Sequence, residues 1–200
     1  MKLGRLLCGL FLVVNAAFAA DAPALKGAVI LLIRHAEKPE SGEGLSLVGM
    51  ARATNYVNYF RNYAVDSNSL TLNYLVATAD SKKSHRPRLT IEPLSQAIHL
   101  PIDCRFANKQ FQELADEIQS KPRGNHILIS WHHGEIPNLL QALGADPSQL
   151  LPESKWPDPV FGWVIQLRYD DKGRLLEARR FNQKLMPGDT ETESIAGTSK

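Results

Sequence analysis

A short apolar run near the start of the chain limits the possible folds more than any other feature. Residues 29–33 are five consecutive aliphatic residues, and Arg34 and His35 follow them directly. An apolar run of this length, followed by a polar loop, predicts a buried strand. The strand would deliver a cation and an imidazole side by side at its carboxyl end.

Strands and helices alternate along the rest of the chain. Further strands are expected at 74–79 and 126–133, and helices are expected to begin near Ser46 and Ser84. Two apolar segments flank the sequence DDKG at 170–173, which is a hairpin signal. Two more helices are expected at 111–120 and 134–145. This alternation predicts an α/β fold, a three-layer sandwich in which helices flank a mostly parallel central sheet.

Polar residues gather where the expected strands end or the next helix begins. The three clusters are Arg34-His35, Ser84-His85-Arg86 and His132-His133. Ligands of such sheets bind in the crevice at the carboxyl ends of the strands. Guanidinium groups bind phosphate through paired hydrogen bonds, and neutral imidazole is a competent nucleophile near pH 7. The clusters therefore predict a phosphate pocket in which a histidine attacks phosphorus.

Four segments in order support this interpretation. They read LIRHAEK, LSLVGMARA, ATADSKKSHRPRLTIEPLSQAIHLPI and LISWHHGEIPNLL. Together they resemble the signature segments of the histidine phosphatase superfamily, also called phosphoglycerate mutase-like. The first resembles the family's R-H-G-E signature, with Ala36 in place of the glycine. The resemblance spans residues 29–143 and implies the phosphoglycerate mutase-like fold.

The resemblance also implies a role for each matching residue. His35 would be the nucleophile that becomes phosphohistidine, and Arg34 and Arg86 would bind the phosphate. His133 would be the second pocket histidine, because a glycine follows it, as in the family. His132 is the less favoured holder of that role.

The general acid is left open by the sequence. No glutamate matches the position that many family members use, so Glu135 is the first candidate and Asp103 the second. A substrate with a good leaving group would need no acid. His85 can lie in the pocket or on the surface.

A metal site is not expected. The spacing of His132, His133 and Glu135 fits no known helical zinc motif, and two nearby arginines would repel a cation. The mechanism that the resemblance implies needs no organic cofactor either.

The first nineteen residues have the pattern of a secretory signal peptide. MKLGR carries two positive charges, LLCGLFLVV is a short apolar run, and Ala17-Phe18-Ala19 fits a cleavage site. We therefore expect residues 1–19 to be removed, residues 20–186 to form the histidine phosphatase domain, and residues 187–200 to form a disordered tail. The mature protein would be periplasmic or secreted, without a stable membrane anchor.

The charge of the mature chain argues against nucleic-acid binding. Without Lys2 and Arg5, the chain has 21 basic and 21 acidic residues, so its net charge is near zero. Binding to nucleic acid normally needs a clear basic excess. A small phosphorylated substrate is therefore the expected partner.

The sequence as a whole predicts an exported phosphatase that hydrolyses a phosphomonoester through a phosphohistidine on His35. One alternative is a non-catalytic protein that binds a phosphate ligand or an envelope sugar in the same pocket. A second is an exported metal-binding protein that uses His132 and His133. Neither the natural substrate nor the oligomeric state follows from the sequence.

Overall fold

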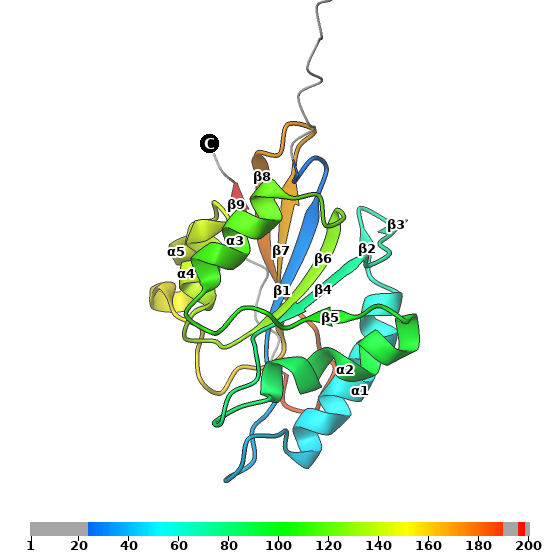
Figure 1. Cartoon of the computed structure of the whole chain (residues 1–200), viewed down its shortest axis with the longest axis vertical. Coiled ribbons are helices and arrows are strands. Elements are labelled where there is room, and N and C mark those ends of the chain that lie inside the picture. The colour runs from blue at the N-terminus through cyan, green and yellow to red at the C-terminus, as the bar shows by residue number, and fades with distance from the viewer. Residues whose placement is uncertain (1–23, 190–195, 199–200) are drawn as a thin grey trace, which may run out of the picture.

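The computed structural model describes residues 24–189 and 196–198 of the 200-residue chain. The elements, in chain order, are β1 (Val29–Arg34), α1 (Leu47–Arg61), β2 (Ala64–Val65), β3 (Asn68–Ser69), β4 (Tyr74–Ala77), α2 (Arg86–Ile98), β5 (Ile102–Asp103), α3 (Phe111–Ser120), β6 (His126–Trp131), α4 (Ile136–Ala142), α5 (Pro147–Leu150), η1 (Pro152–Ser154), β7 (Trp163–Tyr169), β8 (Leu175–Asn182) and β9 (Ala196–Thr198). Figure 1 shows their arrangement.

The central sheet has seven strands in the order β5-β4-β6-β1-β7-β8-β9. Strands β5, β4, β6 and β1 run parallel to one another. Strand β7 is antiparallel to β1, β8 is antiparallel to β7, and β9 is antiparallel to β8. Five of the seven strands therefore point the same way, and the carboxyl ends of β1, β4 and β6 lie at one edge. The predicted α/β class and mostly parallel sheet are confirmed.

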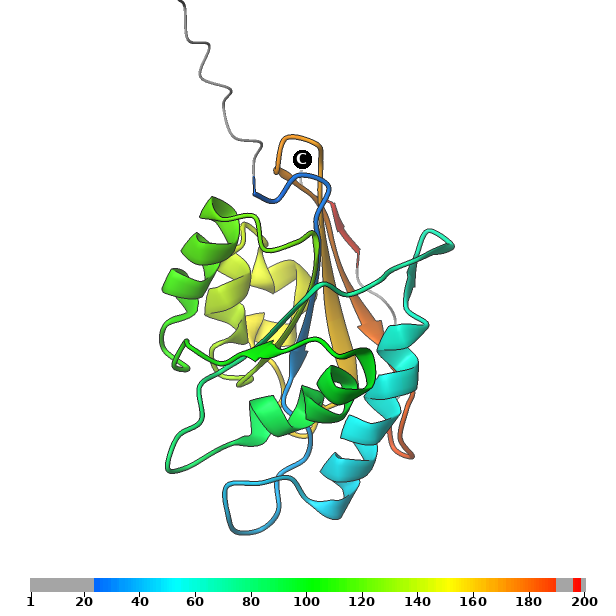
Figure 2. The same cartoon turned by 45° about the vertical axis from the view of Figure 1, so that its right-hand side comes forward.

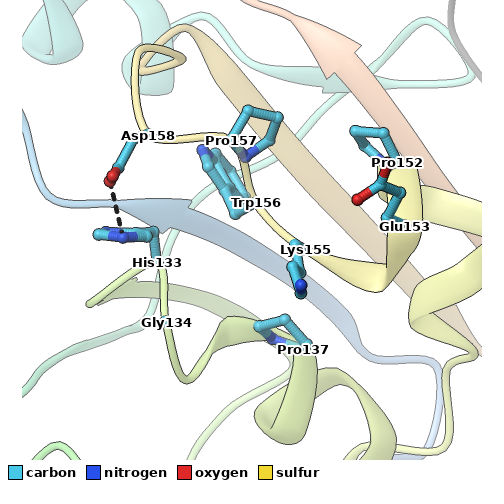
Figure 3. Close-up of a pocket in the computed structure, with 9 residues that line it drawn as sticks. All are labelled: His133, Gly134, Pro137, Pro152, Glu153, Lys155, Trp156, Pro157 and Asp158. Atoms are coloured by element: carbon cyan, nitrogen blue, oxygen red, sulfur yellow. Dashed lines mark ion pairs between the residues drawn. The ribbon is translucent and has the colours of Figure 1, made fainter.

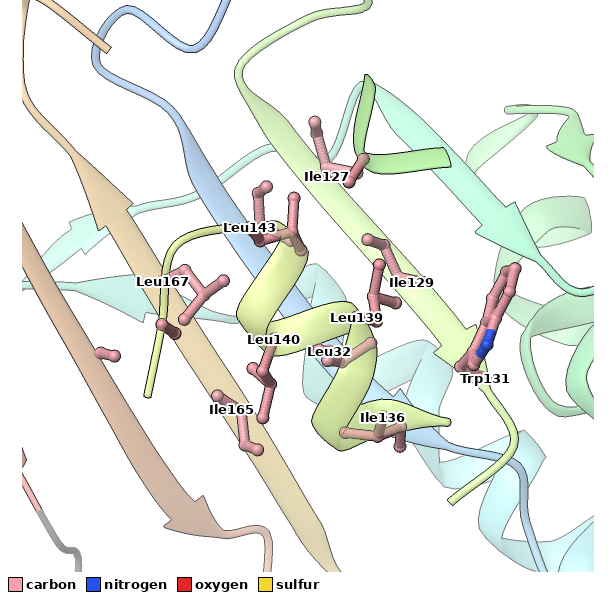
Figure 4. Close-up of a cluster of buried hydrophobic side chains, with 14 of the residues drawn as sticks. Leu32, Ile127, Ile129, Trp131, Ile136, Leu139, Leu140, Leu143, Ile165 and Leu167 are labelled. Atoms are coloured by element: carbon pink, nitrogen blue, oxygen red, sulfur yellow. The ribbon is translucent and has the colours of Figure 1, made fainter. Parts of the chain in front are cut away.

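Helices cover both faces of this sheet, which gives the three layers that the sequence predicted (Figure 2). Helices α1 and α2 pack on one face, where Tyr56 and Ile91 belong to one buried cluster. Helices α3 and α4 pack on the other face, where Leu114 and Leu139 belong to a second cluster. Figure 4 shows Leu139 of α4 among the side chains of this cluster.

The position of β1 between the two layers explains why its apolar run is unbroken. Successive side chains of a strand point to opposite faces. Ile30 and Leu32 accordingly pack with the α3–α4 layer, whereas Leu31 and Ile33 pack with the α1–α2 layer. All four are fully buried, and each such side chain contributes about 1.5–3 kcal/mol relative to an exposed one. A polar residue anywhere in this run would face a hydrophobic core.

The predicted ends of the elements are mostly close to those observed. Ser46 is the N-cap of α1, and its side chain accepts a hydrogen bond from the Gly49 N–H at 3.1 Å. The predicted strand from Tyr74 ends two residues early, at Ala77. The predicted hairpin around DDKG is confirmed as β7–β8.

The predicted disordered tail at 187–200 is wrong for two of its parts. Asp189 has a side chain only 5% exposed and forms an ion pair with Arg52. Residues Ala196–Thr198 form β9, which pairs with β8. Pattern analysis missed both because each depends on a partner distant in the sequence.

The predicted signal peptide at 1–19 lies outside the described residues. Within the described part of the chain, no helix has both the length and the apolar character needed to cross a membrane.

Candidate active site

The parallel pairing of β1 with β6 brings the histidines of the two strand ends together. His35 follows β1, and its backbone N–H donates to the Trp131 carbonyl at the end of β6, at 2.9 Å. The ring centroid of His35 lies 5.1 Å from that of His132 and 6.4 Å from that of His133. The structure thus places all three predicted histidines in one cluster.

His35 is held as a neutral ring with one nitrogen free. Its Nδ1 lies 2.7 Å from the Ala36 carbonyl, which can only accept, so Nδ1 donates and Nε2 keeps its lone pair. The ring is buried, and burial is the main reason that its pKa is lowered to about 3. The nearby charge of Arg34 lowers the pKa further, whereas the hydrogen bond to Ala36 opposes the shift. At neutral pH, Nε2 is therefore an unprotonated nitrogen, as a nucleophile requires.

Helix α2 fixes the backbone just after His35. The Ala36 N–H donates to Thr90 Oγ1 at 2.8 Å, and the Thr90 hydroxyl donates to the Arg86 carbonyl at 2.7 Å. Thr90 is completely buried. It therefore links the loop that carries His35 to the first turn of α2, which carries Arg86.

A buried ion triad holds the same loop from the other side. Arg52 of α1 forms ion pairs with Glu37 at 2.7 Å and with Asp189 at 2.8 Å. Gly49 lies one turn earlier on α1, and a Cβ there would lie 2.4 Å from the Glu37 carbonyl oxygen. The helix can approach the loop this closely only because residue 49 has no side chain.

Arg34 contacts both the neighbouring loop and the histidine cluster. Its Nη1 donates to three carbonyl oxygens, those of Pro157 at 3.1 Å, Asp158 at 2.7 Å and Val160 at 3.0 Å. Its guanidinium carbon also lies 4.0 Å from the centre of the Phe161 ring. Burial lowers its pKa to about 10, so it remains charged at neutral pH. Its Nε is buried and has no hydrogen-bond partner among the described residues.

Arg86 begins α2 and brings a second positive charge to the cluster. Its charge lowers the pKa values of His35 and His132, and Thr90 joins its backbone to that of Ala36, the residue after His35. Its Nη1 donates to the Gly42 carbonyl at 3.3 Å, and its Nε, like that of Arg34, is buried without a partner in the described chain. Two buried, unpaired guanidinium N–H groups near one imidazole are suited to binding an anion.

The two adjacent histidines differ in what their ring nitrogens contact. Nδ1 of His133 lies 3.2 Å from Arg34 Nη2, and its Nε2 lies 2.9 Å from Asp158 Oδ1 (Figure 3). Both nitrogens of His133 are therefore engaged. His132 makes no hydrogen bond through its ring to any described residue, lies closer to His35, and has a pKa lowered to about 4, mainly by burial and then by Arg86. The geometry favours His132 over the predicted His133 as the second pocket histidine.

Neither carboxylate predicted as a general acid touches the histidine cluster. Glu135 is buried, forms an ion pair with Lys109 and accepts a hydrogen bond from Asn138 at 2.7 Å. Asp103 accepts from the Tyr74 hydroxyl and forms an ion pair with Arg105. These contacts give both carboxylates structural partners away from His35. The structure thus offers no support for Glu135 or Asp103 as the acid.

Two residues of the site match no sequence motif. Asp158 is the carboxylate that contacts a clustered histidine, and it lies in a proline-rich loop. Phe161 lies 6.4 Å from His35, centroid to centroid. His85, left open by the sequence, directly precedes α2, and its backbone N–H donates to the Glu43 carbonyl. Its ring makes no stacking contact with His35 within the described chain.

A metal site is not evident in the described ranges 24–189 and 196–198. They hold no group of three or more histidine, cysteine, aspartate or glutamate side chains placed to bind a metal ion.

Comparison with known proteins bears on the fold. The sequence matches no protein-family profile, and a search of curated proteins gave no match. Among solved structures, phosphoglycerate mutase from Plasmodium falciparum is 17% identical, with a TM-score of 0.53, and the match covers 84% of this chain and 99% of that one. Alpha-ribazole phosphatase from Shigella flexneri is 13% identical, with a TM-score of 0.49, over 72% of this chain and 92% of that one. A mycobacterial glucosyl-3-phosphoglycerate phosphatase is 15% identical, with a TM-score of 0.46, over 78% and 97%. The first TM-score exceeds 0.5, and on it the chain has the phosphoglycerate mutase-like fold that its sequence motifs predict.

Proposed function

We propose that this chain is an exported histidine phosphatase, which hydrolyses a phosphomonoester through a phosphohistidine on His35. One observation carries the proposal. A neutral imidazole, with Nε2 unprotonated, lies in a cluster with two arginines whose buried Nε–H groups have no partner among the described residues. Such a pocket is suited to a phosphate group that a nitrogen nucleophile can attack.

The reaction has two steps. In the first, Nε2 of His35 forms a bond to phosphorus, and the ester oxygen leaves with the bonding electrons and takes up a proton. In the second, water attacks the phosphohistidine, the P–N bond breaks, and inorganic phosphate leaves. Arg34 and Arg86 stabilise the charge on the phosphoryl oxygens in both steps, so no metal or organic cofactor is part of the proposal.

In this mechanism, His132 is the second pocket histidine beside His35. Its ring is close to His35, is half-buried, and is free of hydrogen bonds to the described residues. One of its nitrogens can donate to the transferring phosphoryl group. His133, with both nitrogens engaged by Arg34 and Asp158, instead orients Arg34.

The test is hydrolysis of p-nitrophenyl phosphate with EDTA present, measured for the wild type and for His35→Asn. His99→Asn is the matched control, because His99 is an exposed residue with φ 55° that asparagine tolerates well. We expect turnover by the wild type and the control, and none by His35→Asn. Labelling with a ³²P-phosphoester should give an acid-labile phosphoprotein in the wild type only.

Two results would count against the proposal. Equal turnover by His35→Asn would exclude His35 as the nucleophile. Binding of inorganic phosphate without turnover of any phosphoester at pH 5 to 8 would favour the non-catalytic binding protein instead.

Export belongs to the proposal and rests on the signal-peptide pattern in the sequence alone. Amino-terminal sequencing of the protein from the extracytoplasmic fraction should give a chain that begins at Ala20. A protein that retains Met1 in the cytoplasm would contradict it.

A further inference from the structure

A cavity of about 640 Å³ lies beside the histidine cluster. One wall is the loop after β6 and the start of α4, with His133 and Pro137. The other wall is the segment from Pro152 to Asp158 (Figure 3). Neither His35 nor Arg34 lines the cavity, so it is separate from the phosphate pocket described above.

The cavity and the phosphate pocket share a boundary. His133 lines the cavity, and its ring centroid lies 6.4 Å from that of His35. Arg34 donates to the carbonyls of Pro157 and Asp158, two residues that also line the cavity. A group bonded to a phosphate at His35 would therefore have this cavity as its neighbour, across the His133 ring.

The lining of the cavity combines apolar rings with four polar side chains, those of His133, Glu153, Lys155 and Asp158. Figure 3 shows Pro137, Pro152, Pro157 and Trp156 around the space. Trp156 is almost fully buried, and its indole N–H donates to the Val160 carbonyl at 2.8 Å, so only part of the ring borders the cavity. These rings offer flat apolar contacts, and the four polar side chains can bind polar substituents of the same ligand.

The cavity is much larger than a phosphate group, so a phosphate alone would not fill it. Cavities of about 300–1,000 Å³ hold drug-sized organic ligands, with apolar walls and a few polar groups that orient the ligand. A glycine in the lining leaves further room, because a Cβ on Gly134 would have no atom within 4 Å. A small polyol phosphate would leave most of this space to water.

We infer that the cavity binds the organic group of the substrate, and that this group presents an apolar face of fused or linked rings. This inference rests on the proposed function, since it takes the phosphate to be at His35. It assigns the chain to phosphomonoesters whose organic group is large enough to fill the cavity and presents a ring face to the prolines and Trp156. The three prolines and Trp156 would supply most of the contact area.

The first experiment compares kcat/KM for phenyl phosphate and 2-naphthyl phosphate. The two phenols are similar in acidity, so the chemical step is matched and the second ring is the difference. Burial of about 40 Å² more apolar surface should favour the naphthyl ester about fivefold. In the double variant Pro137→Ala/Pro152→Ala the preference should fall to about twofold, because both rings are lost. Pro101→Ala, an exposed proline outside the cavity, is the matched control and should keep the wild-type preference.

A second measurement separates this inference from the proposed function. Calorimetric titration of His35→Asn with each ester reports binding without turnover, and the naphthyl ester should bind about fivefold more tightly. If that preference appears while the wild type hydrolyses neither ester, the cavity assignment stands and the phosphatase proposal fails. If both esters are hydrolysed equally well, or the double variant keeps the full naphthyl preference, the cavity assignment is overturned and the phosphatase proposal stands.

Discussion

Replacing Gly49 with alanine should destabilise the protein, although alanine is the better helix former. Gly49 is the third residue of α1, and helix propensity alone predicts a gain of about 1 kcal/mol for the substitution. The structure predicts the opposite sign. The new Cβ would lie 2.4 Å from the carbonyl oxygen and 3.0 Å from the nitrogen of Glu37, and both are backbone atoms that no side-chain rotation can move away.

The expected loss can be worked from these contacts. Overpacking in a closely packed site costs about 1–3 kcal/mol, and this contact is at the severe end of that range. The Glu37 carbonyl also accepts a hydrogen bond from the Ser46 N–H at 2.9 Å, which a shift of the loop would weaken by about 1 kcal/mol. After the gain in helix propensity is subtracted, the free energy of unfolding should fall by about 3 kcal/mol.

Urea denaturation followed by circular dichroism measures this change. Asn58→Ala is the matched control, because Asn58 is an exposed residue of the same helix whose side chain makes no hydrogen bond in the described chain. The control should be stabilised by a few tenths of a kcal/mol. An alanine at residue 49 that leaves stability unchanged or raises it would refute the close approach of α1 to the loop after His35.

Three further predictions concern the site and its supports. Asp189→Asn should lower the free energy of unfolding by about 2 kcal/mol in urea denaturation, because it leaves the buried Arg52 with one charged partner; a change below about 0.5 kcal/mol would contradict the triad. His132→Gln should reduce kcat for p-nitrophenyl phosphate more than His133→Gln does, and the reverse order would restore His133 as the second pocket histidine. The free energy of unfolding should fall as the pH drops from about 6.5 towards 4. In this range the unfolded state takes up protons on His35 and His132, whereas the native state, in which their pKa values are about 3 and 4, does not. The double variant His35→Asn/His132→Gln should show a flatter profile in thermal melts, and an unchanged slope would exclude these two rings as its source.

Local patterns were enough to predict the central part of the fold. The aliphatic run of β1 and the cap at Ser46 have their signals within a few residues, and both are found where expected. The short strands β2, β3 and β5 were not predicted, because two residues are too few to show a period. Their pairing depends on where longer elements place the chain.

The sequence predicted which strand ends would meet, but not which side chain of a pair would face the pocket. His132 and His133 are adjacent, and the choice between them depends on contacts with Arg34 and Asp158. Asp158 is 124 residues from Arg34 in the chain, so no local pattern joins them. Glu135 was chosen as an acid for its closeness to His133 in sequence, yet its carboxylate pairs with Lys109.

The ion pair between Arg52 and Asp189 affects when the protein can finish folding during its synthesis. A ribosome synthesises the loop that carries His35 first, but Asp189, the partner that completes its support, follows Arg52 by 137 residues. Until Asp189 emerges, the Arg52 guanidinium has only Glu37 as a charged partner. A nascent chain therefore cannot complete the support of the loop that carries His35 until Asp189 has left the ribosome. In the export that we propose, such a late-closing contact would delay the native state until Asp189 has also crossed the membrane.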